Sequence, residues 1–111
     1  MSEIPSSFAG VPAILGEALT ARGYADPTPV QAAVLRDDAR GRDLVVSAQT
    51  GSGKTVAFGM AMATELLADD GRIEPSRTPL ALVIAPTREL AMQVGRELAW
   101  LYDKTGARVA I

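Results

Sequence analysis

Apolar and polar positions along the chain fall into strand-like runs and helix-like stripes. Residues 44–48 and 80–85 are continuous apolar runs of strand length, the pattern of strands buried on both faces of a parallel sheet. A shorter run at 108–111 predicts a third strand. Apolar residues spaced three and four apart fill the stretches between them and predict helices. Strands that alternate with helices imply right-handed parallel crossovers, so we expect an α/β fold.

Four helices are expected, each with recognisable end signals. The stretches that carry helical periodicity are 12–23, 29–35, 53–68 and 87–106. Glycines close the first and last of these, and prolines precede or open others. Two polar connections separate them. The first is a charged loop at 36–43. The second lies at 69–79 and is rich in turn-forming residues, so we expect it to be the most mobile surface segment.

The stretch 48–55, Ala-Gln-Thr-Gly-Ser-Gly-Lys-Thr, separates a predicted strand from a predicted helix. Gly51 and Gly53 would let backbone amides turn toward an anion, and the following helix would add its positive end. Lys54 would then reach the outer phosphates of a nucleotide, and Thr55 would hold a magnesium ion. The alternative is a plain glycine-rich turn with Lys54 as a solvated residue of the first helical turn.

The turn at 24–31 contains a capping-box pattern. Thr28 can cap a helix whose first residue is Pro29, and Gln31 follows Thr28 by three positions. In one interpretation the Gln31 amide only reaches back to the Thr28 backbone. In the other it recognises adenine, because an amide offers a donor and an acceptor to the N6 and N7 edge of that base.

Composition narrows the functional classes. The chain has 111 residues, of which 48% are hydrophobic, and this suits one small domain that is short for a complete doubly wound fold. It contains no cysteine and no histidine, which excludes disulfides, thiolate metal sites and histidine catalysis. The net charge of −2 argues against a globally basic nucleic-acid binder. Without an apolar run near membrane-spanning length, we expect a soluble, cytoplasmic protein.

Three blocks together resemble one family. The turn 24–31, the loop 48–55 and the block Pro86-Thr87-Arg88-Glu89-Leu90 are similar, in order and spacing, to the Q motif, motif I and motif Ia of DEAD-box ATP-dependent RNA helicases. The resemblance implies a RecA-like P-loop NTPase fold, in which a parallel sheet is flanked by helices and ATP and RNA bind between two such domains. Residues 1–111 would be the N-terminal portion of the first domain, truncated before the Walker B strand.

The resemblance also implies roles for individual residues. ATP would be bound by Phe8, Tyr24, Gln31, Gln49, Thr50, Gly51, Ser52, Gly53, Lys54 and Thr55. Lys54 and Thr55 would be the catalytic candidates, with Thr55 on Mg²⁺, and Pro86, Thr87 and Arg88 would contact the RNA backbone. Simpler alternatives are that Phe8 packs on the domain, that Thr87 is only a helix cap, and that Arg88 is solvated.

The sequence also departs from the family pattern. Ala48 stands where the first glycine of the phosphate loop is usual, and no Asp-Glu-x-Asp occurs. The second domain with its arginine finger is missing as well, so we expect the isolated chain to bind without hydrolysing ATP and to self-associate or swap elements between copies. The alternatives are a stand-alone nucleotide- or RNA-binding module without catalysis, and a P-loop ATPase acting on DNA or on a protein. The Q-motif block argues against the ATPase alternative.

Overall fold

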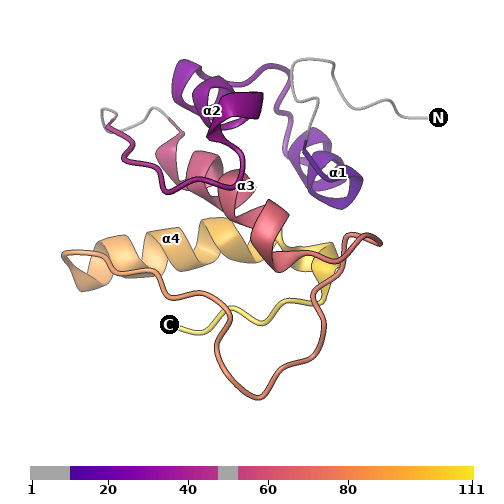
Figure 1. Cartoon of the computed structure of the whole chain (residues 1–111). Helices are drawn as coiled ribbons and strands as arrows, with labels where there is room; N and C mark the ends of the chain where they lie inside the picture. The colour runs from indigo at the N-terminus through magenta and orange to yellow at the C-terminus, as the bar shows by residue number, and fades with distance from the viewer. Residues whose placement is uncertain (1–10, 48–52) are drawn as a thin grey trace.

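The computed structural model describes residues 11–47 and 53–111, and in these residues the chain is built from helices. In chain order they are α1 (Ala13–Ala21), α2 (Pro29–Val34), the short 3-10 helix η2 (Asp37–Ala39), α3 (Lys54–Leu66), α4 (Arg88–Leu101) and the 3-10 helix η3 (Asp103–Thr105). The α-helices α1 to α4 confirm the predicted ones. α3 packs against α2 on one side and α4 on the other, while α1 lies against α4 and η3 (Figure 1).

The core gathers apolar side chains from three of the four α-helices. Its buried members are Val11, Leu15, Leu19, Val56, Met60, Ala63, Leu98, Leu101 and Tyr102. α3 and α4 approach closely at Gly59, where an added β-carbon would lie 2.7 Å from Leu101 Cδ2. Next to this contact the buried Tyr102 hydroxyl donates a hydrogen bond to the Gly59 carbonyl. Small-residue packing and one polar contact therefore fix how α4 sits on α3.

The predicted parallel sheet is not confirmed. Residues 11–47 and 53–111 contain no β-strand, and no backbone hydrogen bond joins the segments around 44–47, 80–85 and 108–111. The expectation that residues 80–85 are buried on both faces is wrong, since Leu82 is 83% exposed and Ile84 84% exposed. A strand needs a hydrogen-bonded neighbour at about 4.8 Å, and none of these described segments provides one for another. They remain extended chain with exposed apolar side chains.

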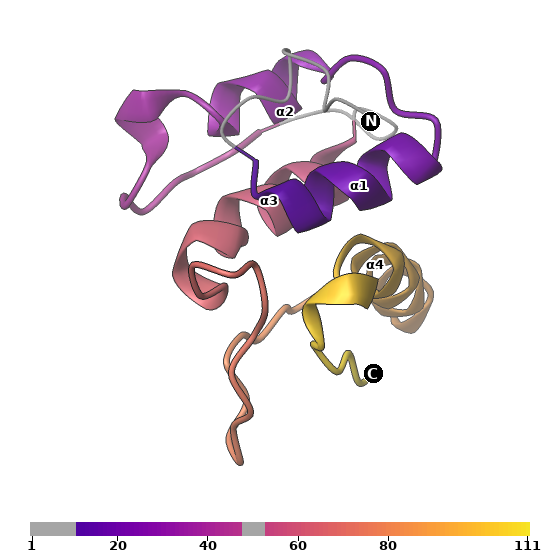
Figure 2. The ribbon, with the colours of Figure 1, turned by 90° about the vertical axis from the view of Figure 1, so that its right-hand side faces the viewer.

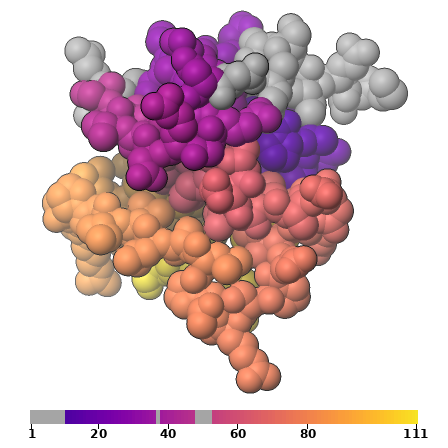
Figure 3. Space-filling view, in the orientation of Figure 1, coloured from indigo at the N-terminus to yellow at the C-terminus, as the bar shows by residue number. Residues whose placement is uncertain are grey.

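The connection between α3 and α4 projects from the helical body (Figures 2 and 3). It is anchored at its start, where the Ile73 amide donates to the Thr105 carbonyl at 2.9 Å and Gly71 is buried beside Ile14.

In the described part of the chain, no helix is long and apolar enough to cross a membrane.

Candidate functional site

The turn before α2 adopts the predicted capping box. The Thr28 hydroxyl accepts a hydrogen bond from the backbone amide of Gln31 at 3.4 Å. In return, the side-chain oxygen Oε1 of Gln31 accepts one from the backbone amide of Thr28 at 3.0 Å. Pro29 is at the start of the helix, where a backbone N–H would have no acceptor within the helix, so the lack of an N–H in proline costs no hydrogen bond. The simpler interpretation of Gln31 is therefore confirmed as one of its roles.

Gln31 has a second partner that local sequence patterns do not predict. Its Nε2 donates to the Gly53 carbonyl at 3.2 Å, so the amide joins the capped turn to the residue that opens α3. Gly53 has φ of +83°, and a β-carbon there would overlap Gln31 Nε2. Both the backbone conformation and the close approach require glycine. The 24–31 turn and the N-cap of α3 are thus joined by one side chain.

Burial sets the access of a ligand to Gln31. The side chain is 0% exposed. Each end of the amide uses one of its two hydrogen-bonding positions, on Thr28 and on Gly53, which leaves one donor and one acceptor position. An adenine could use these remaining positions once it displaces the atoms that cover them.

The first turn of α3 is suited to an anion. Gly53 is the N-cap, and no side chain caps the helix, so the first amides are left for another acceptor. Lys54 is exposed, and Thr55 is half-buried beside it. A nucleotide phosphate fits this donor set, and the Thr55 hydroxyl is an oxygen that could serve as a ligand for Mg²⁺. Four predicted residues of the loop, Gln49, Thr50, Gly51 and Ser52, lie outside the described residues, as does Phe8.

Tyr24 is packed against α4. Its ring stacks on Trp100, with centroids 5.8 Å apart and an angle of 28° between the planes. The Arg22 guanidinium carbon lies 4.9 Å from the centre of the same indole. The sequence pattern did not predict this cluster, although Trp100 lies off the apolar stripe of α4 and was therefore a signal for a contact outside the core. The structure therefore brings Tyr24 to Trp100, whereas the Gln31 side chain bonds Thr28 and Gly53.

The predicted RNA-contacting residues lie at the start of α4. The Thr87 hydroxyl accepts from the Leu90 amide at 3.2 Å, which confirms the helix cap. Pro86 and Arg88 are exposed, and the Arg88 side chain forms no hydrogen bond or ion pair with the part of the chain that the structure describes. α3 and α4 begin on the same side of the molecule (Figure 1). The N-terminal ends of both helices consequently face the same side (Figure 1).

Comparison with known proteins gives a consistent result. The model of the DEAD/DEAH box helicase family matches residues 28–111. DEAD-box ATP-dependent RNA helicase 3B, chloroplastic, from Zea mays is 46% identical over 106 residues, which are 94% of this chain and 14% of that protein. The ATP-dependent RNA helicase DeaD of Klebsiella pneumoniae is 44% identical over 101 residues, 88% of this chain and 15% of that protein.

A solved structure agrees with these relatives. The crystal structure of the RNA helicase Prp28 from Chaetomium thermophilum bound to ADP matches with a TM-score of 0.76 and 34% identity, covering 94% of this chain and 25% of that one. The similarity supports the RecA-like helicase fold. The chain spans about one seventh of the length of the Zea mays relative. Because the family model covers most of the chain and the spatial match covers nearly all of it, the chain belongs to the DEAD/DEAH box helicase family.

Proposed function

We propose that this chain is the ATP-binding and RNA-contacting N-terminal portion of the first RecA-like domain of an ATP-dependent RNA helicase, spanning residues 1–111. The observation that carries the proposal is the hydrogen bond from Gln31 Nε2 to the Gly53 carbonyl. This bond joins the amide that would recognise the base to the start of the helix that would bind the phosphates, so one nucleotide could touch both.

The nucleotide would be divided between two groups of residues. Gln31 would contact the adenine, with Tyr24 and Phe8 as neighbouring aromatic residues. The loop 49–55 would hold the phosphates, with Lys54 on the outer ones and Thr55 on Mg²⁺. The exposed start of α3, without a side-chain cap, supports this division. Bound Mg²⁺ would neutralise phosphate charge.

RNA would bind at the start of α4. Pro86, Thr87 and Arg88 would contact the sugar–phosphate backbone, because amides at a helix N-terminus and an exposed guanidinium both suit a phosphate. Such contacts position the RNA without reading its bases. Duplex separation would require the longer protein. The isolated chain is proposed to bind ATP without turnover, since it has no Asp-Glu-x-Asp motif to position water. A cytoplasmic location and self-association also remain predictions.

The test of the adenine role compares ATP with GTP. Guanine presents an acceptor where adenine has its amino group, so the chain should prefer ATP by about 5- to 150-fold. Gln31→Ala should abolish the preference. Thr28→Ala is the matched control, because it removes the cap hydroxyl and leaves the Gln31 amide and its bond to Gly53 in place.

Isothermal titration calorimetry with each nucleotide measures the ratio. Equal affinity of the unchanged chain for ATP and GTP would remove the adenine role of Gln31. Loss of the preference in the Thr28→Ala variant as well, with the fold intact by circular dichroism, would assign the preference to the shape of the turn instead.

A further inference from the structure

A small cavity lies on the side of α3 that faces η2 and the segment following it. Its volume is about 80 Å³, and residues between 34 and 44 line it together with one face of α3. Leu35, Leu44 and Met60 contribute apolar surface to it. Leu44 is still 40% exposed. The cavity therefore leaves aliphatic surface uncovered by the rest of the described chain.

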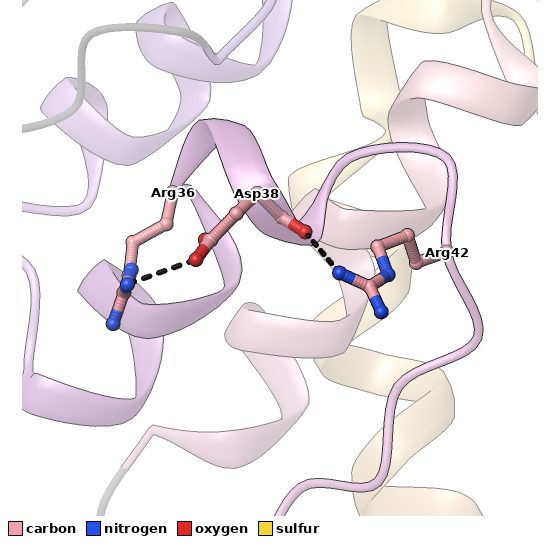
Figure 4. Close-up of polar contacts among 3 residues, drawn as sticks. All are labelled: Arg36, Asp38 and Arg42. Atoms are coloured by element: carbon pink, nitrogen blue, oxygen red, sulfur yellow. Dashed lines mark hydrogen bonds and ion pairs between the residues drawn. The ribbon is translucent and has the colours of Figure 1, made fainter.

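Three arginines line this cavity beside its aliphatic residues. Arg36 Nη2 pairs with Asp38 Oδ2 at 2.9 Å, so the charge of Arg36 is balanced locally. Arg42 Nη1 donates to the Asp38 backbone carbonyl at 3.4 Å, a neutral acceptor. Figure 4 shows the two guanidinium groups on opposite sides of Asp38. Arg40 makes no hydrogen bond or ion pair with any side chain that the structure describes. Among the described residues, Arg40 and Arg42 therefore form no ion pair, and their guanidinium groups can bind carboxylates of a partner.

We propose that this arginine-rimmed pocket docks a short acidic segment of a partner protein, which inserts one aliphatic side chain and pairs its carboxylates with Arg40 and Arg42. Guanidinium groups bind carboxylates in a planar, two-bond geometry. The apolar floor supplies the complementary site for a leucine-like anchor. The pocket differs from the predicted ATP and RNA sites, since none of the residues assigned to those sites lines it.

The lining favours a peptide over RNA. Leu35, Leu44 and Met60 offer no polar partner to a phosphate, and no aromatic side chain lines the cavity to stack on a base. Glu65 also lines the cavity from α3 and would repel any anionic group on that side, whether a phosphate or a carboxylate. An acidic peptide can keep its carboxylates on the arginine side and turn its aliphatic side chain inward.

Binding can be measured by fluorescence anisotropy with a labelled decapeptide in which a central leucine is flanked by Glu and Asp residues. Two control peptides carry Ala in place of leucine, or Gln and Asn in place of the acidic residues. We expect saturable, salt-weakened binding of the first peptide only. Arg40→Ala should weaken it by about 2- to 5-fold, as for an exposed ion pair. The double variant Arg40→Glu and Arg42→Glu should weaken it by about tenfold or more.

Thr64→Trp provides a second test, because Thr64 lines the cavity and is exposed on α3. The larger side chain should block the pocket without disturbing the core. Arg77→Glu is the matched control for the charge-reversal variants at Arg40 and Arg42, since Arg77 is exposed in the α3–α4 connection and does not line the cavity. Circular dichroism verifies that each variant is folded.

Three results would overturn the proposal. One is the absence of saturable peptide binding. Another is binding that is unchanged in both the double variant and Thr64→Trp. The third is tight binding of a ten-nucleotide oligouridylate that the double variant loses while the peptide fails to bind, which would identify an RNA site.

Discussion

Replacing Gly53 with Ala perturbs the point at which the turn before α2 meets the start of α3. Gly53 has φ of +83°, and its carbonyl accepts the Gln31 amide at 3.2 Å. A β-carbon at this position would overlap Gln31 Nε2. The substitution therefore imposes two separate costs, one from the backbone and one from the displaced amide.

Gly23 isolates the first of these costs. It has φ of +84°, and nothing lies within 4 Å of a β-carbon added there. Gly23→Ala should lower the free energy of unfolding by about 1–2 kcal/mol, the cost of a left-handed alanine. Gly53→Ala should lose a further ~1–3 kcal/mol, because the fully buried Gln31 amide loses its acceptor. The smaller entropy of the unfolded chain affects both variants alike and cancels in the comparison.

Urea denaturation followed by circular dichroism gives both free energies, with a domain of this size expected to total about 5–15 kcal/mol. In a Gln31→Ala background, the extra cost of Gly53→Ala over Gly23→Ala should disappear, since no amide remains to be displaced. Equal destabilisation by Gly53→Ala and Gly23→Ala in the unchanged background would refute the Gln31–Gly53 contact.

Three further predictions follow from exposure and burial. Arg88→Ala should weaken RNA binding about equally for different sequences, and the loss should be larger at low salt. Fluorescence anisotropy with oligouridylate and oligoadenylate measures this, and a loss confined to one of the two would contradict a backbone contact. Burial raises the pKa of Tyr102 well above its ordinary value. The stability that this phenol contributes should therefore persist below pH ~10 and be lost above it, and Tyr102→Phe should not show this fall. The exposed apolar side chains of 44–46 and 80–84 should promote self-association by strand pairing, and a concentration-independent monomer in light scattering would contradict this.

Helix positions could be predicted from the sequence because their signals are local. The capping box joins Thr28 to Gln31, and the Thr87 hydroxyl bonds the Leu90 amide, each across three residues. Contacts of this range depend on residue type and spacing alone. The apolar stripe of α4 is only partly buried, since Leu98 and Leu101 are in the core and Leu90 remains 43% exposed.

Long-range contacts could not be predicted in the same way. Gln31 and Gly53 are separated by 22 residues, and Tyr24 meets Trp100 from the far end of the chain. No periodicity specifies which turn packs on which helix. The predicted strands show the same limitation, because an apolar run such as 80–85 indicates a preference for burial but supplies no hydrogen-bonding neighbour.

The most direct test of the proposed function is ATP binding by the chain and its dependence on Lys54. The chain contains one other lysine, Lys104, which is exposed and forms a surface ion pair with Glu17 at 3.7 Å. Lys104→Ala is therefore a matched control for removing a positive charge. Calorimetric titration with ATP and Mg²⁺ should show binding in the unchanged chain and in Lys104→Ala, and little binding in Lys54→Ala. A separate assay should detect no phosphate release from any of the three. ATP binding of equal strength in the Lys54→Ala variant would contradict a phosphate site at the start of α3.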